Sequence, residues 1–177
     1  LDAGEGPASI MAGLFLFPLA VFAGLFLHPR AVMTYQGGVA ASSGPISVVL
    51  YAATDGPDTD WTAKLVDVSP TGYAKNLCDG ILRARYRAGY AQPSLLEANK
   101  VYEYTIDVGV TGNVFRKGHR IRVEISSSYF PYYLRNLNTG ADNIGLETTS
   151  IIATQKIMHS AGQASHIVLP IIPRTQP

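Results

Sequence analysis

The chain has 177 residues, and 14 Lys and Arg stand against 13 Asp and Glu, so its formal net charge is +1. A charge this close to zero argues against nucleic-acid binding, which needs a basic excess to displace counterions from phosphates. Charged residues make up only 15% of the chain, which suits a β-rich fold with a large buried surface. Cys78 is the single cysteine, which excludes an intrachain disulfide and a thiolate metal cluster.

An apolar stretch opens the chain. From Gly6 to Leu27 no side chain ionises, and four phenylalanines are spread through this region: Phe15, Phe17, Phe22 and Phe26. As a helix rising about 1.5 Å per residue, residues 10–28 are long enough to cross the hydrocarbon core of a bilayer. A helix that is apolar all round belongs in lipid or deep inside a protein. We therefore predict a transmembrane anchor over 10–28, preceded by a tail over 1–9; a signal-like segment and a buried helix are the alternatives.

The residues that follow this segment bear on its orientation. His28 and Arg30 come directly after the predicted helix, and positive residues favour the cytoplasmic side of a membrane. The chain is therefore expected to be a single-pass membrane protein with its body in the cytoplasm, and the periplasm is the alternative. Residues 29–44 end in a Gly- and Ser-rich stretch and are expected to form a linker.

From Pro45 onward the apolar residues alternate with a period of two, which is typical of β-strands. Turn residues separate the segments that we expect to form strands, namely 45–53, 60–69, 81–87, 101–110, 119–128, 150–158 and 166–172. Seven or eight short strands at this spacing predict an all-β fold, a jelly-roll β-sandwich over 45–173. Residues 174–177 form the expected C-terminal tail.

Two blocks carry a resemblance to a known family. They are SGPISVVLYAATDGPDTDWTAKLVDVSPTGYAKNLCDGILRARYR and, after it, VYEYTIDVGVTGNVFRKGHRIRVEISSSYFPYYLRNLNTG. In this order they resemble the C-terminal domain of the X-Pro dipeptidyl-peptidase and cocaine-esterase hydrolases. The resemblance implies a galactose-binding-like jelly roll that packs against an α/β-hydrolase domain with a Ser–Asp–His triad. Only 43 residues precede Gly44 and the chain contains no G-x-S-x-G nucleophile elbow, so we carry over the fold and no catalytic role.

The loop SSYFPYYLRNLNTG is rich in residue types that are enriched at protein interfaces. We take five of its side chains as a candidate partner interface: Tyr129, Phe130, Tyr132, Tyr133 and Arg135. Because aromatic faces also stack on sugar rings, a glycan platform is one alternative. Internal packing of the loop is the other.

Basic residues form a second candidate patch. Arg83, Arg85 and Arg87 alternate along the expected strand 81–87, so they would share one face of the sheet. Two further arginines are expected nearby on another strand, Arg120 and Arg122. Such a face would suit anionic lipid headgroups. The alternative is an ordinary solvated face.

The remaining titratable residues yield no site. Asp55, Asp58 and Asp60 fall within six residues, a density that calcium sites share, but aspartates in turns usually cap backbone amides. His159 and His166 have no carboxylate at the spacing of a metal site. We therefore expect no catalytic residue, no metal and no cofactor.

These observations predict a non-catalytic, membrane-anchored accessory subunit whose jelly roll docks on the integral membrane subunits of a larger complex. A bacterial respiratory or photosynthetic assembly would be a natural host, with the lipid bilayer as second partner and no nucleic acid. One alternative is a fragment or split half of a serine hydrolase of the X-Pro dipeptidyl-peptidase and esterase type. Another is a surface-anchored glycan-binding module.

Overall fold

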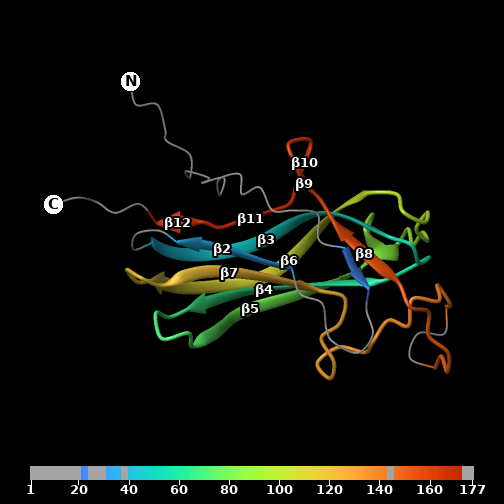
Figure 1. Cartoon of the computed structure of the whole chain (residues 1–177), viewed down its shortest axis with the longest axis horizontal. Coiled ribbons are helices and arrows are strands. Elements are labelled where there is room, and N and C mark those ends of the chain that lie inside the picture. Colours follow the sequence, from blue (N-terminus) through green and yellow to red (C-terminus); the bar gives the residue numbers. More distant parts are fainter. Residues whose placement is uncertain (1–20, 24–30, 37–39, 143–145, 173–177) are drawn as a thin grey trace.

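The computed structural model describes residues 21–23, 31–36, 40–142 and 146–172, which form two β-sheets packed face to face (Figure 1). The six-stranded sheet contains β1 (Val21–Ala23), β3 (Ala40–Thr54), β6 (Tyr102–Phe115), β8 (Thr154–Ile157), β11 (His166–Val168) and β12 (Ile171–Ile172). The four-stranded sheet contains β2 (Ala31–Gln36), β4 (Asp60–Val68), β5 (Ala74–Arg83) and β7 (Arg120–Ser126). A small two-stranded sheet joins β9 (His159–Ser160) and β10 (Gln163–Ala164), and the helix η1 (Ala84–Tyr86) is a single 3₁₀ turn.

Strand β3 organises the six-stranded sheet. It pairs along one edge with β6 and along the other with β12, β11 and β8 in turn, always antiparallel. Its inward side chains Ile46, Val48 and Leu50 are at most 1% exposed. The predicted strand over 45–53 is therefore confirmed as an interior strand.

The core lies between the two sheets and follows the predicted alternation. On β6, Tyr104, Ile106 and Val108 are buried, and they belong to one apolar cluster with Trp61 and Leu65 of β4. The rings of Trp61 and Tyr104 lie 5.8 Å apart between centroids. Burying each such large apolar side chain contributes about 1.5–3 kcal/mol, so this layer dominates the stability of the sandwich.

The two sheets approach each other closely where β5 passes β6. A Cβ atom added to Gly80 would lie 1.8 Å from the backbone oxygen of Asp107. Only glycine therefore fits at this crossing. The close approach sets β6 against β5 at the edge of the four-stranded sheet.

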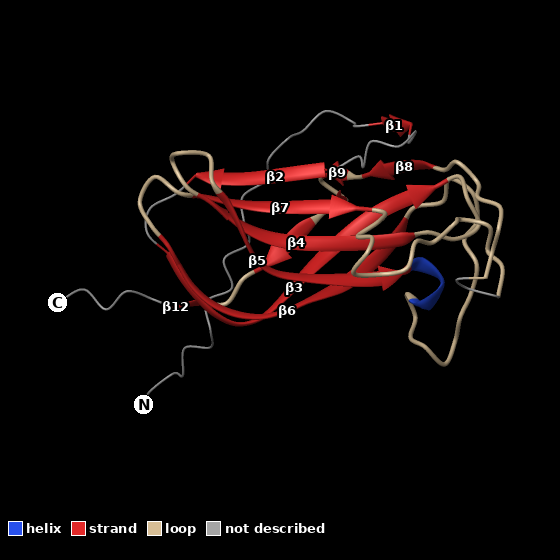
Figure 2. Cartoon of the chain, turned by 90° about the horizontal axis from the view of Figure 1, so that it is seen from below, coloured by secondary structure: helices blue, strands red, loops and turns tan. Residues whose placement is uncertain are grey.

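Three connections, of which the β5–β6 and β7–β8 loops are long, gather at one end of the sandwich (Figure 2). They are the β3–β4 loop (55–59), the β5–β6 loop (84–101, which includes η1) and the described parts of the β7–β8 loop (127–142 and 146–153). The short turns after β4 and β6 lie at the opposite end. The loop-bearing end is where polar side chains become buried, as shown below.

Two predictions for the N-terminal part are wrong. Val21–Ala23 form β1, which pairs with β8, so residues 10–28 do not form one continuous helix. The backbone of Val21–Ala23 pairs with the edge of β8, and Val and Phe are favourable strand residues. Of the four proposed anchor residues, Phe22 lies in β1 and the other three fall outside the described residues. Within the part of the chain that the structure describes, no helix is long and apolar enough to cross a bilayer.

The expected linker over 29–44 is also wrong. Ala31–Gln36 form β2 and pair with β7 along their whole length, and residues 40–44 begin β3. Residues 37–39 of the Gly- and Ser-rich stretch lie outside the described residues. Much of the segment expected to connect two domains is therefore part of the sandwich.

The expected strand over 81–87 ends early. Strand β5 stops at Arg83, and the chain turns into η1, where the Ala84 amide donates a hydrogen bond to the Thr59 carbonyl at 2.9 Å. Arg85 and Arg87 therefore do not lie in a row with Arg83 on one sheet face. The alternation of apolar and basic residues continues past the point where the sheet pairing ends.

Candidate functional site

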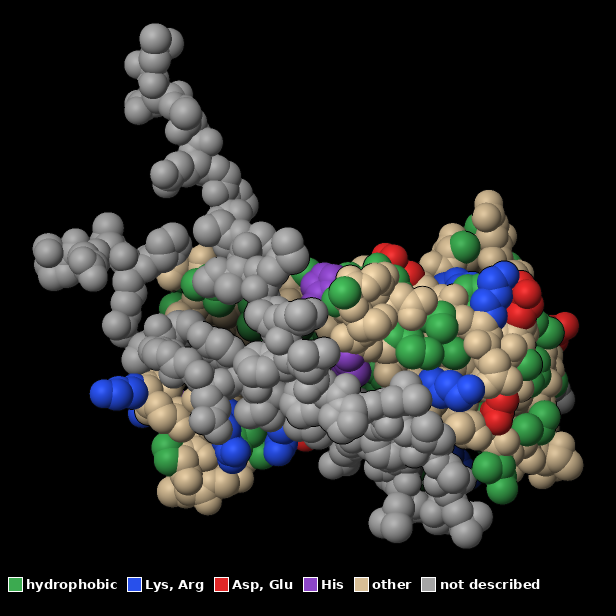
Figure 3. Space-filling view, turned by 45° about the horizontal axis from the view of Figure 1, so that its top comes forward, with side chains coloured by type: hydrophobic (Ala, Val, Ile, Leu, Met, Phe, Trp, Pro, Cys, Tyr) green, Lys and Arg blue, Asp and Glu red, His purple; other side chains and the backbone are tan. Residues whose placement is uncertain are grey.

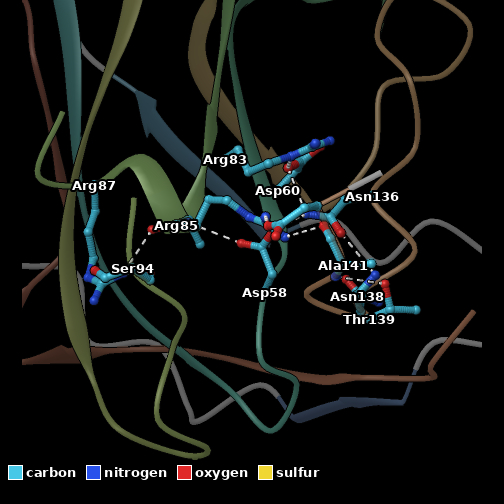
Figure 4. A network of polar contacts seen from close by, with 12 residues as sticks. Asp58, Asp60, Arg83, Arg85, Arg87, Ser94, Asn136, Asn138, Thr139 and Ala141 are labelled. Atoms are coloured by element: carbon cyan, nitrogen blue, oxygen red, sulfur yellow. Dashed lines mark hydrogen bonds and ion pairs between the residues drawn. The ribbon is translucent and has the colours of Figure 1, made fainter. Parts of the chain in front are cut away.

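Two buried aspartates stand at the loop-bearing end of the four-stranded sheet. Asp58 lies just before β4 and Asp60 is its first residue, and their exposed fractions are 0% and 2%. Strand pairing places Arg83 opposite Asp60, and the η1 turn brings Arg85 beside Asp58 (Figure 4). Each carboxylate therefore meets one guanidinium.

The arginines pair with these carboxylates through several hydrogen bonds. Arg83 Nε and Nη2 donate to the two oxygens of Asp60 at 2.8 and 3.1 Å, and this contact raises the pKa of Arg83. Arg85 donates from Nε to Asp58 Oδ2 at 2.8 Å and from its backbone amide to Oδ1 at 3.1 Å. Arg85 Nη2 also donates to the Ala141 carbonyl at 3.0 Å. Buried charges need such partners, because an unpaired one is costly to remove from water.

Asn136 links the two carboxylates to the β7–β8 loop. Its Nδ2 donates to Asp58 Oδ2 at 3.0 Å and to Asp60 Oδ1 at 3.1 Å, and its Oδ1 accepts from the Asn138 amide at 2.9 Å. Asn138 Nδ2 in turn donates to the Ile151 carbonyl at 3.0 Å. We call Asp58, Asp60, Arg83, Arg85 and Asn136 the end network. It ties the β7–β8 loop to the start of β4 (Figure 4).

The same network anchors the β5–β6 loop. The Arg85 carbonyl accepts a hydrogen bond from the Ser94 amide at 2.9 Å, and Arg87 Nη1 donates to the Ser94 carbonyl at 2.6 Å. The Leu96 amide donates to the Pro57 carbonyl at 2.9 Å. The β5–β6 loop is thus fixed by contacts within itself and by a contact to the β3–β4 loop.

The predicted interface residues divide into two groups. Lys64 Nζ lies 3.4 Å from the centroid of the Tyr129 ring, and the Tyr129 ring stacks on that of Tyr132 at 5.0 Å. Tyr129 therefore packs on the outer face of the four-stranded sheet, and burial raises its pKa. Tyr133 is half-buried beside it. Phe130 and Tyr132 are 56% and 78% exposed, and Arg135 is exposed too.

A small hollow lies beneath this loop on the outer face of β4 and β7. Its volume is about 120 Å³, and it is lined by Thr62, Lys64, Glu124, Ser126, Ser128, Tyr129 and Phe130. Pockets for drug-sized molecules usually have several hundred Å³. The hollow has room for a few water molecules or one side chain rather than for a substrate.

The predicted basic face does not form. Arg83 and Arg85 direct their donors to buried carboxylates, and Arg87 directs its own to backbone carbonyls. On β7, which also carries Arg120, Arg122 Nη2 lies 2.9 Å from Glu124 Oε1. Arg83, Arg85 and Arg87 therefore hold loops and strands together.

The three aspartates considered for calcium do not converge on one point. Asp55 Oδ1 accepts a hydrogen bond from the Thr154 amide at 2.7 Å, while Asp58 and Asp60 face the arginines. His166 Nδ1 lies 2.8 Å from the Ala164 carbonyl. Among the residues that the structure describes, no group of three His, Cys, Asp or Glu side chains could hold a metal ion.

Comparison with known proteins assigns the fold to a family. The family described as the X-Pro dipeptidyl-peptidase C-terminal non-catalytic domain matches residues 42–168. The chain belongs to this family. The resemblance drawn from the two sequence blocks is thereby confirmed.

Proteins similar to this C-terminal domain are hydrolases by name. The cocaine esterase of Rhodococcus sp. (strain MB1 Bresler) is 49% identical over 134 residues, which are 75% of this chain and 23% of the esterase. An aminopeptidase from the marine sediment archaeon Thaumarchaeota archaeon superposes with a TM-score of 0.77 at 32% identity, covering 81% of this chain and 26% of its own. An α-amino acid ester hydrolase gives 0.75 at 32% identity, covering 80% and 25%. The chain spans about a quarter of the length of these relatives.

These relatives correct the predicted function and location. The expectation of a membrane-anchored accessory subunit of a larger membrane complex is wrong, because the proteins that match are an esterase, an aminopeptidase and an ester hydrolase. The membrane location predicted with it is wrong as well, because Val21–Ala23 pair as a strand and these relatives are hydrolases. The alternative, a part of a hydrolase of the esterase and X-Pro peptidase type, fits the comparisons better.

Sequence reasoning missed how the end network joins distant segments. It expected the aspartates to cap turn amides, with calcium binding considered and set aside, and it took the arginines as a lipid-facing row. A usable signal was present: Asp58 and Asp60 have the same spacing as Arg83 and Arg85, at the start of one expected strand and at the end of the next along the chain. Two opposite charge pairs in matching register favour ion pairs between the strands.

Proposed function

We propose that this chain is the C-terminal jelly-roll part of a hydrolase that cleaves ester or peptide bonds, and that it supports the catalytic part without supplying the nucleophile. The observation that carries the proposal is the match of residues 42–168 to a domain family described as non-catalytic, together with relatives named as hydrolases. The catalytic part is either joined to this chain or present as a separate polypeptide.

The positions of the hydroxyl and imidazole groups support a non-catalytic role. A serine nucleophile needs a histidine within hydrogen-bond reach, itself oriented by a carboxylate. Ser126 Oγ instead bonds to the Ser128 carbonyl at 3.1 Å. His119 Nδ1 lies 2.8 Å from Asp67 Oδ1, but His119 precedes β7 and Ser126 ends it, so about 20 Å of strand separates them.

A non-catalytic domain assists catalysis by stabilising the conformation that performs it. Whatever binds the folded form and not the unfolded form shifts the folding equilibrium toward the native state. A rigid sandwich with fixed loops suits that role, because little further ordering is needed when it binds.

The test uses the full chain and a catalytic partner. We would co-express the 177-residue chain with the Rhodococcus cocaine esterase from which the stretch matched by this chain has been removed. The truncated esterase is expected to have little ester-hydrolysing activity alone and to regain it, together with a co-purifying complex, when this chain is present. A serine-directed inhibitor is expected to label only the esterase partner. Ester hydrolysis by the isolated chain, or absence of any rescue, would overturn the proposal.

A further inference from the structure

We propose that the catalytic part of the hydrolase docks on one apolar surface at the loop-bearing end of the sandwich, an inference that rests on the proposed function. The surface combines exposed apolar side chains of the β5–β6 and β7–β8 loops: Leu95, Phe130, Tyr132, Leu134, Ile151 and Ile152. We call it the loop-end surface. Arg135, whose guanidinium lies 5.4 Å from the Phe130 ring centroid, stands beside it.

The apolar side chains of the loop-end surface are about half exposed or more. Tyr132 is 78% exposed, Ile152 68% and Leu134 64%, and the other three residues are each 47% to 56% exposed. Figure 3 shows apolar side chains over this end, with charged groups of both signs among them. Isolated exposed apolar residues are ordinary, but a gathered group marks a surface that binds something.

The members of this surface come from two loops that touch each other. A Cβ atom added to Gly140 would lie 3.4 Å from Leu95 Cδ1, so Leu95 packs against the β7–β8 loop. The Ile151 amide donates to the Leu137 carbonyl at 2.9 Å, which places Ile151 beside the outgoing part of the same loop. The stacked Tyr129 ring supports Tyr132 from below.

The end network fixes this surface before any partner arrives. Asn136 and Asn138 hold the β7–β8 loop through Asp58 and the Ile151 carbonyl, and Ser94 holds the β5–β6 loop through Arg85. Ordering a flexible side chain or loop on binding costs affinity. Loops that are already ordered by buried ion pairs avoid most of that cost.

Two observations indicate that the occupant is the catalytic part. Each relative carries about three quarters of its length outside the region that this chain matches, so a large body of protein accompanies this domain and is available to cover its surface. The residue types also fit a protein partner, because exposed Tyr, Phe and Arg are those that carry binding energy at interfaces. The surface has no basic excess that would suit phosphate-bearing partners.

A second apolar region provides a matched comparison. Val110, Val114 and Ile172 lie on the outer face of the six-stranded sheet at the other end, and they are 70%, 53% and 52% exposed. Strand register aligns Val114 with Ala41 and Ala41 with Ile172. These three side chains are aliphatic and include no aromatic or arginine anchor, so we do not assign the catalytic part to them.

The experiment compares variants of the full chain in their binding to the truncated Rhodococcus cocaine esterase. Tyr132→Ser and Leu134→Ser test the loop-end surface, and Val114→Thr is the control on the sheet face. Restored ester hydrolysis is titrated against chain concentration to obtain Kd. Tyr132→Ser is expected to weaken binding about 30-fold, which corresponds to about 2 kcal/mol at 1.4 kcal/mol per tenfold. Val114→Thr is expected to stay within about twofold, and circular dichroism confirms that each variant is folded.

The outcomes separate the two proposals. Rescue by the unsubstituted chain with unchanged Kd for Tyr132→Ser and Leu134→Ser overturns the loop-end surface and leaves the proposed function standing. An equal loss for Val114→Thr also overturns it, because the interface would then lie on the sheet face. No rescue at all overturns the proposed function. If separate chains associate too weakly to titrate, a chimaera in which residues 42–168 replace the matching stretch of the full esterase gives the same comparison through its thermal inactivation temperature.

Discussion

Replacing Arg85 by methionine is expected to destabilise the domain strongly, because it leaves the carboxylate of Asp58 buried without its charge partner. Methionine has a similar length and lacks the guanidinium. The substitution removes the Nε contact to Asp58 Oδ2 at 2.8 Å and the Nη2 contact to the Ala141 carbonyl at 3.0 Å. The backbone amide contact of residue 85 to Asp58 remains.

The magnitude follows from burial. The side chains of Arg85 and Asp58 are 6% and 0% exposed, so water cannot replace the lost partner. Removing one member of such a buried pair typically costs about 3–5 kcal/mol. Replacing both members by uncharged residues is often much less costly. The double variant Asp58→Asn with Arg85→Met is therefore expected to recover about 1–3 kcal/mol of the loss.

Urea unfolding followed by circular dichroism measures the difference through the midpoint concentration and the m-value. Asp142→Asn is the matched control, because Asp142 also contacts Arg85, at 3.3 Å, but its side chain is fully exposed. That variant is expected to unfold at the same urea concentration as the unsubstituted chain. A cost below about 1 kcal/mol for Arg85→Met, or an equal effect of Asp142→Asn, would refute the reasoning from burial.

Three further outcomes are expected. Gly80→Ala places a Cβ atom 1.8 Å from the Asp107 carbonyl oxygen, so it is expected to lower the free energy of unfolding by about 3 kcal/mol or to prevent folding. Gly162→Ala, with open space around its Cβ position, is expected to be neutral in the same urea assay. Burial raises the pKa of Tyr104 from 10.0 to about 12, so the stability linked to its neutral form is present below pH 10 and is lost as pH rises toward 12. In an absorbance titration the raised pKa is expected to appear as a late-ionising tyrosine. Burial lowers the pKa of His159 below 6.5, so as pH falls the unfolded chain takes up a proton first and the free energy of unfolding decreases. His159→Gln is expected to reduce the pH dependence of the urea midpoint between about pH 5 and 7.5, and an unchanged pH dependence would contradict this.

Periodicity predicted most of the sandwich because one face of each strand is buried. Tyr104, Ile106 and Val108 alternate with polar residues on β6, and a shift of one residue would expose all of them. The family resemblance implied a jelly roll, but the pairing of individual strands was not predicted, because alternation alone does not determine it. The partners of β3 on its second edge, for example, come from three short segments near the end of the chain.

The N-terminal prediction failed because hydropathy does not distinguish lipid from protein as the apolar surroundings. Val21–Ala23 are as apolar as a membrane segment requires, yet they pair with residues 154–156 of β8. A short apolar run is compatible with a helix in lipid and with a strand on a sheet edge. The pairing partner lies more than 130 positions away, and no local pattern reveals it.

The arginine row failed for a related reason. Alternation in the stretch ILRARYR is the same on a strand and beyond its end, but the backbone of Ala84 already bonds to Thr59 rather than to a neighbouring strand. Propensity and periodicity describe a segment by itself, whereas strand ends depend on where the partner strand ends. Asp60, the first residue of β4, is paired with Arg83, the last residue of β5.

The end network also explains how irregular loops can carry a docking surface. A sandwich has no strand to satisfy the backbone groups of its end loops, and buried backbone groups without partners are costly. Here side chains take that role, since Arg85 binds the Ala141 carbonyl and Asn138 binds the Ile151 carbonyl. If the loop-end surface depends on this support, Asn136→Ala should weaken binding to the esterase partner while the chain stays folded, because the Asn136 side chain bonds to Asp58, Asp60 and the Asn138 amide. Equal affinity for that variant would show that the loops keep their shape without the network.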